Sequence, residues 1–304
     1  MGRKKKKKNT SVTGQLAGAV IVLIVACCWF GLRKASSPAN AQETAKTEVS
    51  NSTEEDESCQ ETGNVKEAAS ADSAYEIPRN VSMKAPEQML VRYAYTTSYN
   101  KDTRCPNWVA WALTAAHTDG EYARGGHKFL EDTDVPEPRA AYYDIRESEC
   151  GYQRGHMCPA ADNKWAYKAQ KDAFLMTNIC PQNGNLNQRD WKYLEEACRD
   201  WAIKYGKIYI VAGPVFRSKS YRTVGEHRVA VPDAFFKVVM TLGKDNRQPK
   251  AIGFMYENQS GHRKMQEYAC TVDEVEKTTG LDFFYQLDDS VEDKIESQCN
   301  LSAW

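Results

Sequence analysis

The chain has 304 residues, of which 41% are hydrophobic and 27% are charged. This composition is typical of a globular protein, and 18 glycines and 11 prolines are too few for a collagen-like or wholly disordered chain. The formal net charge of −1 excludes any argument for nucleic-acid binding from bulk charge. A site for a polyanion must therefore come from a local group of residues.

The first 34 residues are basic and apolar. They contain eight Lys or Arg and no Asp or Glu, and residues 16–32 are nearly all apolar. As a helix, those seventeen residues span about 25 Å, slightly less than a hydrocarbon core of about 30 Å. More basic residues precede the apolar stretch than follow it, which predicts a cytoplasmic N-terminus and export of the rest of the chain.

Three alternatives stay open for this segment. The first is a retained transmembrane anchor, which places the remainder outside the cytoplasm, in the periplasm or at the cell surface. The second is a lipoprotein, because Ile24 to Cys27 resemble a cleavage box that leaves a lipid on Cys27. The third is a cleaved signal peptide and a secreted protein. We favour the anchor, because the apolar stretch continues past Cys27 to Phe30.

Seven of the ten cysteines lie in the body of the chain: Cys105, Cys150, Cys158, Cys180, Cys198, Cys270 and Cys299. In an exported protein such cysteines are expected to form disulfides. An odd number leaves one of them free or paired elsewhere, and the sequence does not give the connectivity.

Composition divides the chain into three parts. Residues 1–34 form the basic N-terminus and membrane segment. Residues 35–79 carry three basic and ten acidic side chains and few large apolar ones, which predicts a disordered acidic linker. Residues 80–304 are then a single folded domain.

The folded domain is predicted to be α+β. Runs of β-branched and aromatic residues predict strands at residues 89–97, 108–113, 207–212, 234–242 and 250–256. Apolar residues at helical spacing predict helices at residues 165–176, 188–205, 267–279 and 291–298. Because the strands outnumber the helices and do not alternate regularly with them, we expect a mostly antiparallel sheet flanked by helices.

His156 differs from the other four histidines in the residues around it. It closes the segment Gln153-Arg154-Gly155-His156. A glycine before it allows the backbone to approach a ligand closely, and Arg154 is a planar donor suited to phosphate. An imidazole titrates near neutral pH, so His156 is a candidate general base.

A second group of polar residues follows at the start of the helix predicted for residues 188–205. Asn187, Glu195 and Arg199 recur at spacings that place them along one side of that helix. Each has an ordinary alternative: Asn187 as a helix cap, and Glu195 with Arg199 as a surface ion pair. Together with the motif at His156, they favour a site for phosphodiester chemistry.

These motifs, in this order, resemble those of the DNA/RNA non-specific endonucleases, ββα-metal nucleases related to mitochondrial endonuclease G. The resemblance covers residues 89–280 and includes Asn100 to Trp108, Val211 to Phe216 and Val231 to Lys237. It departs from the family at Gln153, where the signature has aspartate. The family implies a ββα-metal fold and hydrolysis of DNA and RNA with little sequence preference, giving 5′-phosphate ends.

The resemblance also implies the roles of individual residues. His156 would be the general base, and Asn187 would be the direct ligand of a single Mg²⁺ or Mn²⁺ ion. Glu195 would hold water bound to that ion. The implied catalytic residues are His156, Glu195 and Arg199. The implied substrate-binding residues are Arg154 and Asn178, and the implied metal ligand is Asn187. Asn178 could also support the site from outside.

Other interpretations are left open. Arg217, Lys219, Arg222 and Arg228 surround Tyr221 and could contact a phosphate backbone, or lie in a solvated loop. The departure at Gln153 leaves open a membrane-anchored nucleic-acid-binding protein with weak or no turnover. A zinc site built from Cys150, His156, Cys158 and Cys180 lacks the usual CxxC spacing. The sequence does not say whether the protein forms a homodimer or has an inhibitor protein.

Overall fold

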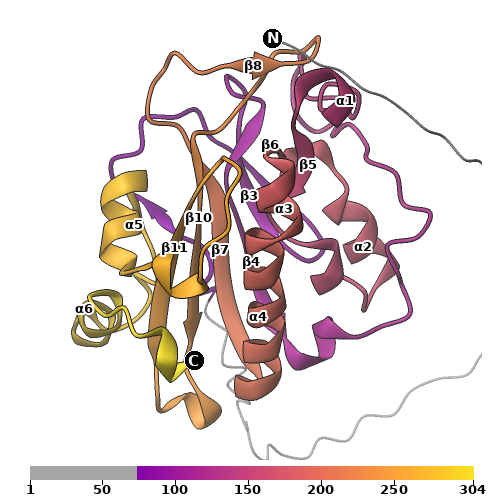
Figure 1. Ribbon diagram of the computed structural model, residues 1–304. Helices are drawn as coiled ribbons and strands as arrows, with labels where there is room; N and C mark the ends of the chain where they lie inside the picture. Colours follow the sequence, from indigo (N-terminus) through magenta and orange to yellow (C-terminus); the bar gives the residue numbers. More distant parts are fainter. Residues whose placement is uncertain (1–73) are drawn as a thin grey trace, which may run out of the picture. The chain divides into compact units, whose positions relative to one another are not determined.

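A seven-stranded sheet forms the centre of the protein in our computed structural model, which describes residues 74–304 (Figure 1). The strand order is β12-β11-β10-β7-β4-β3-β2, and every neighbouring pair is antiparallel. The predicted α+β class with a mostly antiparallel sheet is therefore confirmed.

The strands are β1 Arg79–Asn80, β2 Gln88–Val91, β3 Thr96–Asn100, β4 Cys105–Thr114, β5 Gln153–His156, β6 Ile179–Gln182, β7 Lys207–Val215, β8 Thr223–Val224, β9 Val229–Ala230, β10 Ala234–Thr241, β11 Lys250–Glu257, β12 Ala269–Cys270 and β13 Leu281–Asp282. The helices are α1 Glu147–Cys150, α2 Tyr167–Ala173, α3 Gly184–Gln188, α4 Asp190–Tyr205, α5 Val272–Thr279 and α6 Asp289–Glu296.

Strand β10 shows how the sheet separates two apolar layers. Side chains alternate between the faces of a strand. Phe235 and Val239 accordingly join the core on the α4 side, and Phe236 and Val238 join the core on the α5 side. All eight residues of β10 are buried, so both faces of the sheet are covered.

Helix α4 packs against β4 and β7 and covers one face of the sheet (Figure 1). Its inner face consists of Trp191, Leu194, Cys198 and Trp201, which are buried at steps of three and four residues. The helix ends at Gly206, whose positive φ of 85° suits glycine. The amphipathic pattern in the sequence therefore located this helix correctly.

Helices α5 and α6 pack against β11 from the other side of the sheet (Figure 1). Val272 and Val275 of α5 and Ile295 of α6 enter the second core. A side chain at Gly253 of β11 would lie 2.8 Å from the backbone oxygen of Thr271, so the glycine permits this close approach. The sheet is thus enclosed between two helical layers.

Three predicted boundaries differ from the structure. Residues 89–97 are not one strand, because a turn in which the Arg92 amide donates to the Tyr95 oxygen separates β2 from β3. The helix predicted for residues 267–279 begins only at Val272, because Ala269–Cys270 pairs with β11. Tyr75 and Ile77 pack on the second core, so the folded part reaches into the predicted linker.

The predicted membrane segment lies outside the described residues, as do residues 35–73. Within residues 74–304, no helix has both the length and the apolar character that crossing a membrane requires.

Candidate active site

One cleft of about 290 Å³ brings together residues from four separate parts of the chain. It is lined by five of the six predicted site residues: Arg154, His156, Asn187, Glu195 and Arg199. Arg154 and His156 come from β5, Asn187 from α3, and Glu195 and Arg199 from α4. The predicted convergence of His156 and Asn187 on one site is therefore seen in the structure.

The β5–β6 pair holds His156 at the edge of the cleft. Its register pairs Gly155 with Cys180 and His156 with Ile179. Gly155 is buried, and a Cβ there would lie 2.3 Å from the side-chain oxygen of Gln182. This glycine is needed for packing between the two strands, which differs from the predicted approach to a ligand.

His156 is half-buried between aromatic rings. Its ring centroid lies 5.4 Å from that of Phe129 and 5.2 Å from that of Phe174. Its Nε2 is buried without a hydrogen-bond partner among the described residues. Burial, followed by the nearby Arg124 and Arg154, lowers the pKa of His156 to about 3. The imidazole is therefore neutral at neutral pH, as a general base must be.

Gln153 fixes the orientation of Asn187. The Asn187 Nδ2 donates to Gln153 Oε1 at 2.8 Å, and Gln188 Nε2 donates to the same oxygen at 2.9 Å. Gln153 Nε2 in turn donates to both carboxylate oxygens of Glu147, at 3.0 and 2.9 Å. Because the amide nitrogen of Asn187 is engaged, its oxygen is the atom left to act as a ligand. The glutamine thus has a partner, Glu147, that the sequence did not reveal.

Glu195 is influenced by the charge of a buried lysine that the sequence analysis did not assign. Lys237 of β10 is fully buried, and its Nζ is 4.3 Å from the centroid of the Trp191 ring. This Nζ has no hydrogen-bond partner among residues 74–304. Burial raises the pKa of Glu195 to about 7, and the Lys237 charge opposes this shift. Strand alternation was the available signal, since it places Lys237 between Phe235 and Val239 on the α4 face.

Arg199 is held in place by a buried aspartate. Its Nη1 lies 2.9 Å from Oδ1 of Asp162, whose side chain is 1% exposed. Asp162 Oδ2 also accepts a hydrogen bond of 3.1 Å from the indole of Trp111. The alternative of a surface ion pair between Glu195 and Arg199 is thus not the arrangement found, because Arg199 is anchored to the segment that follows His156.

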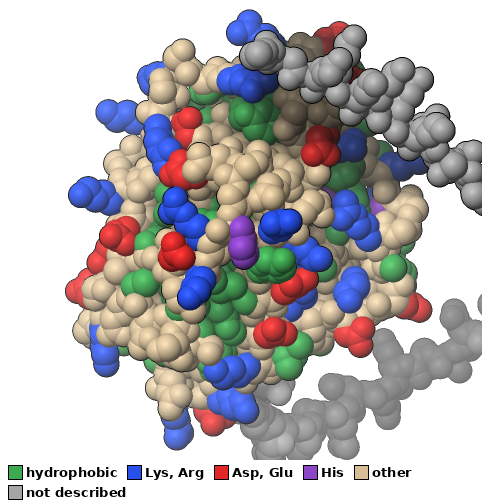
Figure 2. All heavy atoms as spheres, in the orientation of Figure 1, with side chains coloured by type: hydrophobic (Ala, Val, Ile, Leu, Met, Phe, Trp, Pro, Cys, Tyr) green, Lys and Arg blue, Asp and Glu red, His purple; other side chains and the backbone are tan. Residues whose placement is uncertain are grey.

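The cleft is also lined by basic side chains that the sequence analysis did not identify. They are Arg124, Lys164 and Lys192. With Arg154 and Arg199 they make five basic groups around the single carboxylate of Glu195. The cleft is therefore suited to an anion, even though the face in Figure 2 shows basic and acidic side chains interspersed.

Asn178 does not line the cleft. It is fully buried, and its Oδ1 accepts a hydrogen bond of 2.9 Å from the amide of Cys158. Its Nδ2 donates to the backbone oxygens of Cys158 and Ala173, each at 2.9 Å. This geometry favours the supporting role for Asn178 over direct contact with substrate, because it fixes the chain just after His156.

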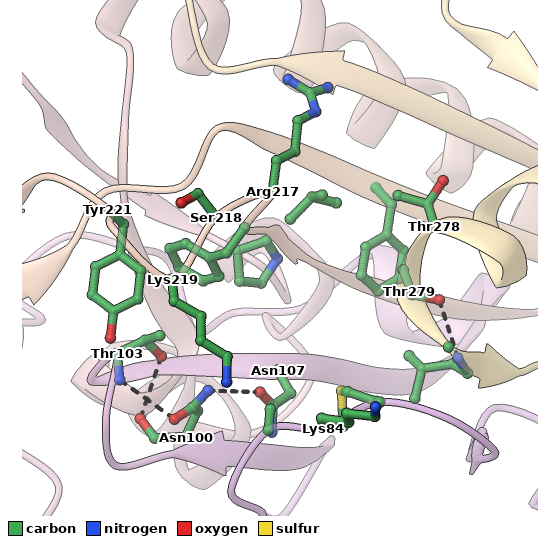
Figure 3. A pocket seen from close by; sticks show the side chains of 18 of the residues that line it. Lys84, Asn100, Thr103, Asn107, Arg217, Ser218, Lys219, Tyr221, Thr278 and Thr279 are labelled. Atoms are coloured by element: carbon green, nitrogen blue, oxygen red, sulfur yellow. Dashed lines mark hydrogen bonds between the residues drawn. The ribbon is translucent and has the colours of Figure 1, made fainter.

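Two of the four basic residues around Tyr221, Arg217 and Lys219, line a different cavity of about 590 Å³, which shares no lining residue with the cleft. Figure 3 shows Arg217, Lys219 and Tyr221 beside this cavity. Arg217 is already paired with both carboxylate oxygens of Glu257, at 2.7 and 2.5 Å.

The structure gives no support to the disulfide prediction, because all seven cysteines of the described residues are free thiols. Cys105, Cys158, Cys180 and Cys198 are buried in the main core, where a thiol packs as a small apolar group. No His/Cys cluster with the geometry of a metal site occurs within residues 74–304, which removes the zinc alternative.

The cleft residues nevertheless fit a hard divalent ion. Mg²⁺ retains several waters and needs only one or two protein oxygens. The oriented carboxamide oxygen of Asn187 and the carboxylate of Glu195 are oxygen donors of this kind, and both line the same cleft.

Comparisons with known proteins give the same family. A family model described as DNA/RNA non-specific endonuclease matches residues 78–290. "Nuclease EXOG, mitochondrial" of Xenopus laevis is 33% identical over 206 residues, with 64% of this chain and 57% of the relative covered. "Nuclease C1" of Cunninghamella echinulata var. echinulata is 34% identical over 214 residues, with 66% and 83% covered. The chain thus matches less than two thirds of the Xenopus relative.

A solved structure supports the fold. The structure described as an EndoG/EndoGI complex has a TM-score of 0.63 and 25% sequence identity, and the match covers 67% of this chain and 89% of the other. This agrees with the α+β architecture of a ββα-metal nuclease.

The predicted location outside the cytoplasm is corrected by the same comparisons. Relatives from Xenopus laevis, Schizosaccharomyces pombe and Saccharomyces cerevisiae are named as mitochondrial nucleases. The prediction of a membrane-anchored, exported enzyme is therefore wrong. Its weakness was physical, because a basic start without acidic residues is common to several kinds of targeting segment.

The cleft geometry and the match over residues 78–290 lead to one assignment. The chain belongs to the family of DNA/RNA non-specific endonucleases.

Proposed function

We propose that this protein is a divalent-metal-dependent endonuclease that hydrolyses phosphodiester bonds in DNA and RNA. The observation that carries the proposal is the single cleft that joins His156, Asn187 and Glu195 with five basic side chains. An imidazole, oxygen donors for a cation and donors for phosphate are the groups that this hydrolysis needs.

His156 is the general base in this proposal. It takes a proton from the attacking water through the imidazole, which lines the cleft. Bound phosphate is negative and lies near Arg124 and Arg154, so it offsets the charges that lower the pKa of His156. Substrate binding therefore makes the imidazole a stronger base than it is in the free protein.

The other residues position the phosphate and the ion. Arg154, Arg199 and the lysines of the cleft bind phosphate oxygens. Asn187 would present its oxygen to a bound ion, and Glu195 would accept hydrogen bonds from water held by that ion. A bound Mg²⁺ or Mn²⁺ would neutralise charge that develops on the leaving 3′ oxygen. The products carry 5′-phosphate and 3′-hydroxyl ends.

Little sequence preference is expected. The cleft offers mainly charged groups suited to phosphate, and phosphate contacts carry no direct sequence information.

Nicking of plasmid DNA and cleavage of a structured RNA by the full-length chain test the proposal. Activity should require Mg²⁺ or Mn²⁺ and stop with EDTA. His156→Ala should lose about 100- to 10,000-fold in rate, and Asn187→Ala nearly as much. His117→Ala and Asn185→Ala are matched controls outside the cleft and should keep wild-type rates. DNA ligase should reseal nicks that carry 5′-phosphates.

Two results would overturn the assignment. One is near-normal cleavage by His156→Ala. The other is nucleic-acid binding by the wild-type protein without any metal-dependent cleavage. The second result would support binding without turnover, the alternative raised by Gln153 in place of the family aspartate.

A further inference from the structure

Three carboxylates meet where α5 and α6 pack together. Asp273 and Glu276 lie one helical turn apart on α5, and Glu296 is the last residue of α6. One oxygen from each lies within 4.8 Å of the others. Within residues 74–304, this is the only group of three or more His, Cys, Asp or Glu side chains arranged in this way.

Glu296 gives this cluster its unusual character. Glu296 is buried, with only 5% of the residue exposed. Its Oε1 is buried and has no hydrogen-bond partner among the described residues. A buried polar atom without a partner is costly unless something satisfies it. The orphaned oxygen belongs to the residue that closes the cluster.

The strongest electrostatic influences on Glu296 come from charges of one sign. They are the acidic side chains Glu276, Glu292, Asp273 and Asp282. Asp282 is already paired with Arg79. Carboxylates packed this closely favour either protonation of one of them or a cation between them.

We propose that Asp273, Glu276 and Glu296 form a binding site for a calcium ion that fastens α6 to α5. Three carboxylates offer up to six oxygens, which suits the six to eight oxygen ligands of Ca²⁺. One of these oxygens, Glu276 Oε1, also accepts a hydrogen bond of 2.8 Å from the Phe283 amide, which holds that side chain in place.

The ligand set suits Ca²⁺ better than Mg²⁺. Ca²⁺ takes six to eight oxygens in a flexible geometry, whereas Mg²⁺ demands a near-ideal octahedron and usually keeps several waters. The three carboxylates lie within 4.8 Å of one another, which is close enough for them to share one ion.

This site is separate from the catalytic cleft. The cleft lies on the α4 side of the sheet, whereas α5 and α6 pack on the opposite core. The role of the calcium ion is therefore structural, and the proposal does not depend on nuclease activity.

Thermal unfolding of the full-length protein, freed of metals and titrated with CaCl₂, tests the site. At a Ca²⁺ concentration 100-fold above Kd, the melting temperature should rise by about 5 to 10 °C. Mg²⁺ at the same concentration should give a much smaller rise. Glu296→Gln keeps the shape of the side chain but removes its charge, so the calcium-dependent rise should disappear.

Controls separate this site from other effects. Asp293→Asn removes an exposed carboxylate of α6 that is not in the cluster, and it should keep the full rise. Asn187→Ala should also keep it, because it alters only the catalytic cleft. If Glu296→Gln does not fold, Asp273→Asn, at an exposed position, should weaken calcium binding at least tenfold. Two results would overturn the proposal. One is no rise in the wild type at 10 mM CaCl₂, a concentration above the Kd of about 1 mM of the weakest extracellular calcium sites. The other is an equal rise in Glu296→Gln.

Discussion

Burial between two phenylalanine rings and the charges of two arginines keep the imidazole of His156 neutral. Burial is the largest cause of its lowered pKa, and the charges of Arg124 and Arg154 act in the same direction. The folded protein therefore holds the imidazole neutral at pH values where an unfolded chain would protonate it. Both the activity and the stability of the protein should reflect this difference.

The first prediction concerns pH. The pKa of His156 is about 3 in the folded protein and about 6.5 in the unfolded chain, so between these pH values only the unfolded chain protonates this imidazole. The free energy of unfolding should therefore be unaffected by His156 above pH 6.5 and should fall as the pH drops below that value. kcat/KM should show no loss attributable to His156 between pH 8 and 6. Arg124→Ala should raise the pKa of His156, because it removes one of the charges that lower it, and NMR titration of the imidazole in the two proteins would measure the change. An unchanged His156 pKa in Arg124→Ala would contradict this account, and Arg247→Ala is the control.

The second prediction concerns Gln153 and Glu147. Gln153→Glu places a second carboxylate against Glu147 and should raise the Mg²⁺ concentration for half-maximal activity about tenfold or more, because outer-shell partners tune metal affinity by this much. Glu147→Gln combined with Gln153→Glu restores a donor and an acceptor at matching lengths, so the double variant should recover. Metal titrations of the four proteins in a double-mutant cycle measure the coupling. Strictly additive effects would show that the two side chains do not act as a pair.

The third prediction concerns Lys237. Its charge lowers the pKa of Glu195 against burial, which holds that pKa near 7. Lys237→Met should therefore raise the pKa of Glu195, and the loss of kcat/KM on acidification should begin at higher pH. Activity at pH 9 should be affected much less than activity at pH 7. Equal losses at both pH values would indicate a structural defect instead.

At the scale of elements, the β5–β6 pair and the α3–α4 junction place the site. Arg189, with φ of −123° and ψ of −92°, separates α3 from α4. Asn183 caps α3 through hydrogen bonds to its side-chain oxygen from Asn185 at 3.0 Å and Leu186 at 3.3 Å. Asn187 thus lies in its own short helix, which the non-helical backbone of Arg189 separates from α4, and not at the start of α4 as predicted.

The fourth prediction belongs to the β5–β6 pair. Gly155→Ala forces a methyl group against Gln182, which must move, so the free energy of unfolding should fall by about 1 to 3 kcal/mol. Because His156 is the next residue, kcat should fall with it. Gly125→Ala, at an open position, is the control and should change neither quantity. Denaturant unfolding and initial rates check this, and a fully stable, fully active Gly155→Ala would show that the contact is easily relieved.

At the scale of the whole molecule, charge is balanced overall and concentrated locally. The net charge is −1, yet the cleft carries five basic side chains and one acidic one. Phosphate contacts release counterions, so they control the salt dependence of binding. The two basic groups of the protein can therefore be distinguished by a salt titration.

The fifth prediction makes this comparison. A variant with Arg124, Lys164 and Lys192 changed to alanine should lose up to about 2.7 from the slope of log K against log salt for duplex DNA, about 0.9 per phosphate contact. The matched triple variant of Arg217, Lys219 and Arg222 should keep the wild-type slope. Filter binding with the Asn187→Ala background avoids cleavage. The reverse pattern would place the nucleic acid at the cavity of Figure 3.

Much of the fold of this protein could be predicted from its sequence. Helical spacing of Trp191, Leu194, Cys198 and Trp201 determined α4, and β-branched and aromatic runs determined β7, β10 and β11, because local periodicity directly reflects which face is buried. The order of the motifs at His156 and Asn187 also indicated the family. The compartment did not follow, because a basic and apolar N-terminus suits several destinations.

Only the tertiary structure decided how the site is held together. Asp162 anchors Arg199, Glu147 holds Gln153, and the charge of Lys237 lowers the pKa of Glu195, yet in the sequence each pair is separated by 6 to 42 positions. The meeting of Asp273, Glu276 and Glu296 likewise depends on how α5 packs against α6. Local sequence specifies which face of an element is apolar, whereas the partners of a buried charge are set by how those elements pack.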